Sequence, residues 1–330
     1  MNFEVLCRQM RPREERRHPL TGRRPGLSRR RLAEPEESRN VQGQLSGRGA
    51  VLVTGASGGI GQATTRHLAA LGFAVFAGVR RVESAEQLHA DLTPGVRPLV
   101  LDVTDGAAIR AARDALAAAV GEFGLVGLVN NAGVTVPGPL EFLPLDLFRE
   151  QWEVNVTGPL LVTQAMVPLL RLRQGRVVNI GSFSGQVALP FYGAYAASKF
   201  ALDALTDALR LELRPSGIRV VLVEPGSVRT AIWDRALATG EAWLRSAPPD
   251  ALARYGRAMA GVRVNARRLE RAAFGAEVVA RSVGRALTER RPRARYRVAY
   301  PVLLRLLLVL DCFPTWFRDA VIAGTLPRYP

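Results

Sequence analysis

The fold is decided by residues 50–61, which have the sequence AVLVTGASGGIG. An apolar run at Ala50–Thr54 predicts a buried strand, and helical periodicity over Gly59–Leu71 predicts the helix that follows it. The glycines between them let the backbone turn tightly and approach a pyrophosphate, which the amino end of the helix binds through its amides and dipole. A glycine-rich loop alone only marks a turn, so this strand–loop–helix order is what predicts a dinucleotide site.

Strands and helices alternate along the rest of the chain. Near-continuous apolar strands that alternate with helices are typical of a parallel sheet buried on both faces. We therefore expect an α/β fold: a Rossmann-type, doubly wound parallel sheet of about seven strands with helices on both faces. The further predicted strands are Phe73–Val79, Val96–Leu101, Leu125–Val129, Arg176–Ile180, Ile218–Val223 and Tyr296–Tyr300, and the further predicted helices are Ala107–Val120, Asp146–Leu172, Ala194–Leu213 and Ala276–Leu287.

The chain divides into three parts. Residues 1–48 contain twelve arginines and six glutamates with repeated proline and glycine, which predicts disorder, and an over-long reading frame that truly starts near Val41 or Val51 is one explanation. Residues 49–300 are expected to form a single domain, in which the looser segment 229–273 is a helical lid over the substrate. Residues 301–330 form an apolar tail, where Pro301–Leu310 is too short to span a membrane and fits a packed helix or a peripheral membrane contact.

The charge of the chain is strongly basic. The formal net charge is +16, from 45 basic and 29 acidic residues, and Lys199 is the only lysine. This use of arginine indicates a GC-rich coding bias, whereas a nucleic-acid surface would show a basic stripe with a binding motif. The two cysteines, Cys7 and Cys312, and the three histidines are scattered, so we expect a cytoplasmic protein with no disulfide and no metal site.

The end of the second predicted strand distinguishes the two nicotinamide cofactors. NAD sites place a carboxylate there for the ribose hydroxyls, whereas NADP sites place an arginine for the 2′-phosphate. Here Arg80 and Arg81 follow the strand, and the first carboxylate is Glu83. We expect NADP(H), chiefly because the acid is absent, with NAD(H) as the alternative.

Tyr195 and Lys199 lie four residues apart in a predicted helix, so both side chains project into one site. A free tyrosine has a pKa of about 10, and a neighbouring cation lowers that pKa and makes the phenol a usable acid and base near neutral pH. The one lysine of an arginine-biased chain indicates a position that needs a compact charge. Ser182 follows the fifth strand and is placed to hydrogen-bond a substrate oxygen, with Ser184 as its competitor.

These motifs, in this order, resemble the short-chain dehydrogenase/reductase family, in the branch whose loop has the pattern T-G-x-x-x-G-x-G. The resemblance covers residues 50–230 closely and extends loosely to about 300. It implies a catalytic tetrad of Asn155, Ser182, Tyr195 and Lys199, in which Asn155 holds a water for proton relay. With Arg80 added from the second strand, the expected cofactor-binding residues are Gly55, Ser57, Gly59, Ile60, Gly61, Arg80, Asp102, Asn131, Tyr195, Lys199, Pro225, Gly226 and Thr230.

The resemblance also implies a reaction: interconversion of a carbonyl and a primary or secondary alcohol by hydride transfer with NADP(H). The tail resembles that of the branch with 17β-hydroxysteroid and retinol dehydrogenases, which implies a small-molecule substrate that is bulky and apolar. The helices at Asp146–Leu172 and Ala194–Leu213 form the oligomer interface in this family, so we expect a homodimer or homotetramer. The alternatives are a cofactor-binding regulator without turnover, a nucleic-acid or membrane role for the basic ends, and a sugar-nucleotide epimerase or dehydratase.

Overall fold

The computed structural model describes residues 47–81, 83–84, 95–271, 273–298, 309 and 312–324. The expectations for residues 1–48 and for Pro301–Leu310 therefore lie outside the described residues, apart from residues 47, 48 and 309.

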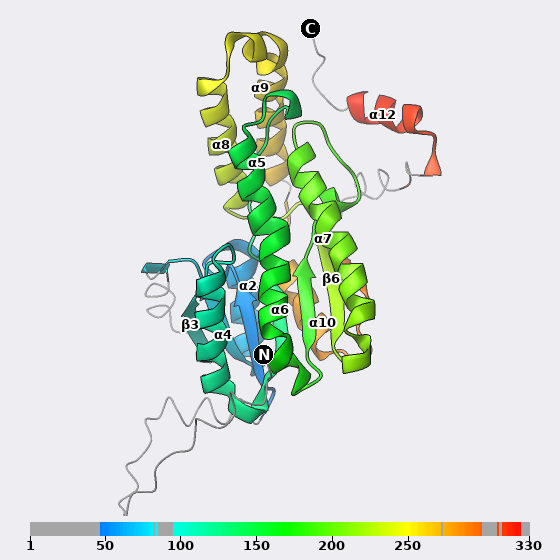
Figure 1. Ribbon diagram of the computed structural model, residues 1–330. Coiled ribbons are helices and arrows are strands. Elements are labelled where there is room, and N and C mark those ends of the chain that lie inside the picture. The colour runs from blue at the N-terminus through cyan, green and yellow to red at the C-terminus, as the bar shows by residue number, and fades with distance from the viewer. Residues whose placement is uncertain are drawn as a thin grey trace, which may run out of the picture. The chain divides into compact units, whose positions relative to one another are not determined.

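Seven parallel strands form one sheet in the order β3-β2-β1-β4-β5-β6-β7 (Figure 1). The chain builds outward from β1 to β3, returns to place β4 beside β1, and then builds outward again to β7. This reversal confirms the predicted doubly wound sheet, and such folds bind ligands outside the carboxyl ends of the strands on either side of the reversal. The strands are β1 (Ala50–Thr54), β2 (Ala74–Val79), β3 (Val96–Val100), β4 (Leu125–Asn130), β5 (Arg176–Ile180), β6 (Arg219–Pro225) and β7 (Arg295–Val298).

Helices cover both faces of the sheet. Side chains alternate across a strand, so Val51 and Val53 of β1 enter one core while Leu52 enters the other. The first core lies under α2 (Gly59–Ala70) and α10 (Glu277–Thr288). The second lies under α4 (Gly106–Val120), α6 (Gly158–Arg171) and the inner side of α7 (Gly193–Glu212).

The prediction of one continuous α-helix at Asp146–Leu172 is wrong, because the structure divides this segment into two α-helices. The structure has α5 (Leu145–Trp152), then a π-helical turn at Glu153–Thr157, and then α6. Pro159 explains the break, because proline has no N–H to donate to the carbonyl four residues earlier. Such π turns are frequent at functional sites, and this one contains Asn155.

Two further helices occupy the segment for which a lid is predicted. α8 (Ile232–Ser246) and α9 (Pro249–Arg271) lie beyond the carboxyl ends of the strands (Figure 1). They enclose a small apolar core of their own, in which Trp243 and Met259 pack with Phe191 from the loop after β5. The tail contains α12 (Thr315–Gly324), a helix that is not predicted from the sequence. Within the described ranges, every helix is too short or too polar to cross a bilayer.

Candidate active site

The loop between β1 and α2 is shaped by glycine. Gly55 has a φ of +64°, and a Cβ there would lie 2.9 Å from the backbone of Ala132. A Cβ on Gly61 would overlap the carbonyl oxygen of Gly55, whereas one on Gly58 would meet nothing within 4 Å. No side chain caps the amino end of α2, and Ser57 beside it is exposed, so the first amides of the helix face an open cradle. The loop therefore fits the pyrophosphate of a dinucleotide.

Asn131, which follows β4, holds this loop from the opposite side. Its Nδ2 donates to the carbonyl oxygens of Thr54 (2.9 Å) and Gly55 (3.1 Å). The Thr54 hydroxyl oxygen accepts in return from the amides of Asn131 (3.0 Å) and Ala132 (3.1 Å). Asn131 thus keeps the ends of β1 and β4 together at the crevice.

Two of the predicted cofactor-binding residues lie at the ends of neighbouring strands. Arg80 follows β2 and is exposed, and Asp102 follows β3. A hydrogen bond from the Leu101 amide to the Val79 carbonyl (2.7 Å) joins these two strand ends. The Asp102 Oδ1 accepts from the amide (2.9 Å) and the hydroxyl (2.7 Å) of Thr104, which fixes the orientation of the carboxylate.

The segment after β6 closes over the glycine-rich loop. The Thr230 side chain lies 3.0 Å from the position of a Cβ on Gly59, so these two predicted cofactor residues meet. Pro225 is buried at the end of β6, and the amide of Gly226 donates to the last residue of β7 (2.7 Å). Ile60 is half-buried and packs into the core under α2, so its side chain serves the fold.

The three predicted reactive side chains meet at the carboxyl edge of β5. α7 places Lys199 Nζ 5.8 Å from the centre of the Tyr195 ring, and this ammonium donates to the Ile180 carbonyl (2.9 Å). The Ser182 side chain hydrogen-bonds to that of Tyr195. The Ser182 oxygen also accepts from the amide of Ser184 (3.1 Å), so the competitor serine contributes its main chain to this arrangement.

Burial dominates the acid–base properties of this group. It raises the pKa of Tyr195, and the hydrogen bond with Ser182 opposes that rise. Burial also lowers the pKa of Lys199 from 10.5 to about 8, because a buried ammonium loses its hydration. The sequence pattern predicts that Lys199 lowers the Tyr195 pKa, but in the structure desolvation is the larger effect and the ammonium bonds to the main chain.

Asn155 connects the π turn to the rest of the site. Its Nδ2 donates to the Val134 carbonyl (2.9 Å) and to the hydroxyl oxygen of Ser198 in α7 (3.0 Å), and its Oδ1 accepts from the Val134 amide (2.9 Å). A Cβ on Gly133 would lie 3.4 Å from Asn155 Oδ1 and 3.9 Å from Lys199 Nζ. Glycine at this position therefore leaves space between the amide and the ammonium.

Three further buried polar residues of this site are not predicted from the sequence. Thr54 and Ser198 form the bonds described above, and the Gln151 Oε1 accepts from the Val136 amide (2.6 Å). Ser198 is adjacent to Lys199, and Gln151 lies four residues before Asn155. That helical spacing is the signal that could have revealed Gln151, because positions four apart share a face.

Known proteins resemble this chain in sequence and in structure. A family model for the short chain dehydrogenases matches residues 49–240. The chain is 37% identical to an NADPH-dependent 3-dehydrocapnine reductase of Ornithobacterium rhinotracheale, over 84% of the chain and 97% of that protein. It is 36% identical to retinol dehydrogenase 5 of Mus musculus, over 84% and 89%. A short-chain dehydrogenase/reductase from Burkholderia phymatum in complex with NAD has a similar structure, with a TM-score of 0.66, 27% identity and coverage of 78% and 90%.

Proposed function

The chain belongs to the short-chain dehydrogenase family, and we propose that it reduces apolar ketones or aldehydes with NADPH, using Tyr195 as the acid. Like its relatives named dehydrogenases and reductases, it is an NAD(P)-dependent oxidoreductase that interconverts carbonyls and alcohols. The observation that carries the assignment of residues is the meeting of Ser182, Tyr195 and Lys199 at the carboxyl edge of the sheet.

The geometry of the glycine-rich loop supports the proposed cofactor site. The glycine-rich loop and the amino end of α2 would hold the pyrophosphate, and Thr230 with Pro225–Gly226 would cover the nicotinamide end. When bound, the nicotinamide supplies the hydride in reduction and accepts it in oxidation.

The protein's own residues orient the substrate and move a proton. The Ser182 hydroxyl orients the substrate carbonyl, and the Tyr195 phenol donates its proton to the substrate oxygen. A phenol whose pKa is raised by burial keeps that proton across neutral pH, so the acid is in the right form for reduction. Ser182 and the Lys199 ammonium then stabilise the phenolate, and a water between Lys199 and Asn155 returns the proton.

The proposed cofactor preference rests on the end of β2. Arg80 is exposed there, and the carboxylate of Asp102, which follows the neighbouring strand β3, is oriented by Thr104. Relatives differ: one is named NADPH-dependent, and one structure contains NAD. An arginine at this position pairs with the 2′-phosphate of NADP(H).

Cofactor preference is tested with Arg80→Glu, and Arg81→Glu is the matched control one residue further on. We expect Arg80→Glu to lower kcat/KM for NADPH by at least tenfold, about the value of one charge-assisted bond, and to spare NADH. If only Arg81→Glu caused a loss of this size, the 2′-phosphate would be bound by Arg81 and not by Arg80.

The lid supports a bulky apolar substrate. Phe191 and Tyr192, which lie three to four residues before Tyr195, pack with Trp243 and Met259 of the lid, so the lid presents apolar and aromatic groups to the chain just before the proposed acid. For assembly we propose a homodimer or homotetramer through α6 and α7. The large side chains Leu161, Leu172, Phe200 and Leu211 on or beside these helices are 36–64% exposed.

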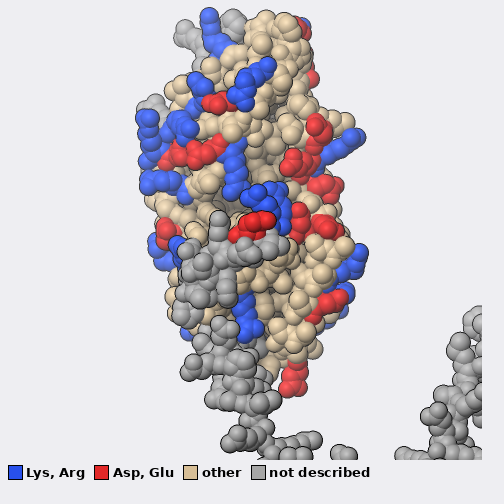
Figure 2. Space-filling model, turned by 90° about the vertical axis from the view of Figure 1, so that its left-hand side faces the viewer, with Lys and Arg blue, Asp and Glu red and all other residues tan. Residues whose placement is uncertain are grey.

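We further propose a cytoplasmic protein without a nucleic-acid partner. On the face drawn in Figure 2, acidic side chains lie among the basic ones, so the positive charge is locally compensated there. A nucleic-acid surface would instead gather its basic residues along one stripe.

The reaction is tested by NADPH and NADH oxidation with a panel of bulky apolar ketones and aldehydes. We expect turnover with NADPH that falls about a thousandfold in Tyr195→Phe, the usual contribution of a positioned acid. Tyr192→Phe is the control, because it removes the hydroxyl of another tyrosine, which lies three residues earlier and packs against the core of the lid. Turnover that survives Tyr195→Phe would refute the assigned acid. Tight NADPH binding with no turnover on any substrate would favour the regulator.

A further inference from the structure

Glu224 is an unusual residue for its position. It lies in β6 immediately before Pro225–Gly226, its neighbours Val220–Val223 are apolar, and it is fully buried. Burying a carboxylate is costly unless charges and hydrogen bonds compensate it. The compensation that this structure provides therefore indicates what the carboxylate does.

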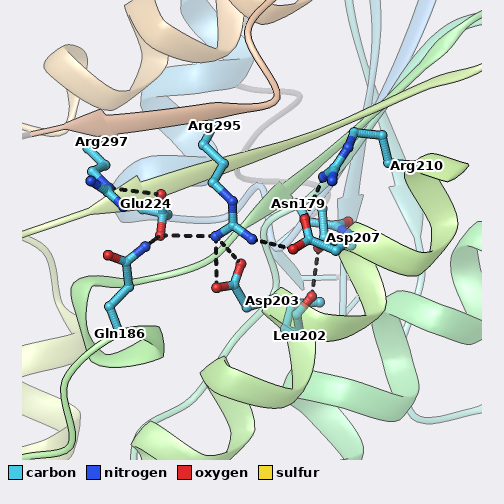
Figure 3. Close-up of polar contacts among 10 residues, drawn as sticks. Asn179, Gln186, Leu202, Asp203, Asp207, Arg210, Glu224, Arg295 and Arg297 are labelled. Carbon is cyan, nitrogen blue, oxygen red and sulfur yellow. Dashed lines mark hydrogen bonds and ion pairs between the residues drawn. The ribbon is translucent and has the colours of Figure 1, made fainter. Parts of the chain in front are cut away.

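A charge-balanced network surrounds Glu224 (Figure 3). Arg295 of β7 donates to both oxygens of Asp203 (2.7 and 2.8 Å) and to Asp207 (2.6 Å), which fastens β7 to α7. Its guanidinium lies 3.7 Å from Glu224 Oε1, and that of Arg297 lies 3.7 Å from Glu224 Oε2. With Arg210 bonded to Asp207, three guanidinium groups face three carboxylates.

The direct hydrogen bond to Glu224 comes from the reaction centre. Both arginines are too far from Glu224 for a hydrogen bond, whereas the Gln186 Nε2 donates to Glu224 Oε1. Figure 3 shows this amide reaching from the loop after β5 to the carboxylate. The 3-10 turn Phe183–Gly185 is capped by Ser182 at its amino end and by Gln186 at its carboxyl end.

The turn is short and closely packed. The amide of Gly185 donates to the Ser182 carbonyl (2.9 Å), and that of Gln186 donates to the Phe183 carbonyl (2.9 Å). A Cβ on Gly185 would lie 3.1 Å from the carbonyl oxygen of Lys199, so the turn rests directly on α7. One end of the turn thus carries the hydroxyl that bonds Tyr195, and the other end is fixed to Glu224.

We propose that Gln186 and Glu224 are positioning residues, whose hydrogen bond fixes the Ser182 turn relative to Tyr195 and to Pro225–Gly226. Burial and the neighbouring Asp203 raise the pKa of Glu224, and Arg295, Arg297 and the Gln186 amide oppose that rise. The carboxylate in turn accepts the hydrogen bond from the amide of the turn. This proposal rests on the proposed role of Ser182 and Tyr195 in the reaction.

The decisive variant is Gln186→Met, which keeps the length of the side chain and removes the donor. We expect kcat to fall about tenfold, because a small displacement of a reacting group is costly, with the KM for NADPH within about twofold of the wild type. Asp207→Asn is the matched control: it weakens the same charge network but does not touch the Ser182 turn. It should leave kcat unchanged.

Two readouts separate positioning from general stability. In a Ser182→Ala background, Gln186→Met should change kcat less than about twofold, because the two residues act through one hydroxyl. The exchanged pair Gln186→Glu with Glu224→Gln restores an amide–carboxylate hydrogen bond and should recover part of the lost kcat. An equal kcat loss in Asp207→Asn, or a full additional loss in Ser182→Ala, would overturn the proposal.

Hydrogen exchange tests the same idea without a substrate. The amides of residues 183–187 should exchange several-fold faster in Gln186→Met than in the wild type or in Asp207→Asn. Unchanged exchange would overturn the positioning role even if the enzyme turns over. Faster exchange in a protein that reduces no carbonyl of the panel would support it while the proposed function fails.

Discussion

The reaction centre and the lid are stabilised by opposite kinds of contact. In the centre, Asn155, Ser198 and Lys199 are buried polar groups with hydrogen bonds of 2.9–3.0 Å to named partners. In the lid, Trp243 and Met259 pack in an apolar core, and ion pairs lie on the outside. Hydrogen bonds are directional and apolar contacts are not. The contacts of the proposed centre therefore fix the directions of its side chains, whereas the apolar contacts of the proposed lid tolerate a change of side chain.

Among the changes considered for the proposed reaction centre, Gly61→Ala should have the largest effect on stability and on NADPH binding. Its Cβ would overlap the Gly55 carbonyl oxygen, which is backbone and cannot rotate away. We expect a loss of about 3 kcal/mol or more in the free energy of unfolding, at the upper end of overpacking effects, with NADPH binding abolished. Thermal unfolding and NADPH fluorescence measure both.

Gly58→Ala is the control for this prediction. The new methyl group would meet nothing within 4 Å, so stability should change by less than about 1 kcal/mol. Equal damage from the two alanines would show that the loop responds to any added side chain rather than to one contact.

Lys199→Met sharpens the comparison, because it should damage function and improve stability. Activity should fall at least about a hundredfold, since the cation that stabilises the phenolate is removed. Stability at pH 7 should rise by about 2 kcal/mol: a depression of the pKa from 10.5 to about 8 corresponds to about 3 kcal/mol, less about 1 kcal/mol for the lost bond to Ile180.

The pH dependence gives an independent check on Lys199. Its pKa is lower in the folded chain, so between about pH 8 and pH 10.5 the unfolded chain binds more protons. The free energy of unfolding of the wild type should therefore increase as the pH rises through this window, because of Lys199. Denaturant titrations at several pH values should show this increase in the wild type and not in Lys199→Met. Identical pH profiles in the two proteins would mean that Lys199 is not the cause of the increase.

The strands around the proposed centre could be predicted from the sequence, whereas the π turn at Asn155 and the Gln186–Glu224 contact could not. The central strands agree with their apolar runs because both of their faces are buried, whereas the edge strand β3 is only partly buried. The break at Asn155 was missed, because apolar side chains continue through Pro159 into α6 and conceal the change of register. The Gln186–Glu224 contact joins residues 38 apart, and only the pairing of β5 with β6 brings them together. The one local clue was a glutamate at the end of an apolar strand.

The inner side of the lid should respond to Trp243→Phe in substrate affinity. This change keeps an aromatic ring, removes the hydrogen bond from Nε1 to the Phe142 carbonyl (3.3 Å), and leaves unfilled volume beside Met259. We expect the KM for bulky ketones to shift several-fold while kcat stays within about twofold, because uniform binding is altered and the acid is not. A large fall in kcat would mean that the lid helps to orient the reacting atoms.

The outer side of the lid should be the least sensitive part of the comparison. Arg263 pairs with Glu241 at 3.3 Å, but the two side chains are 52% and 44% exposed. Water screens such a pair, so Arg263→Ala should change stability by less than about 0.5 kcal/mol and leave kcat and KM unchanged. A larger effect in thermal unfolding or in steady-state kinetics would mean that the outer pair sets the position of α9 over the site. The contacts of the lid would then fix its geometry, as those of the proposed centre do.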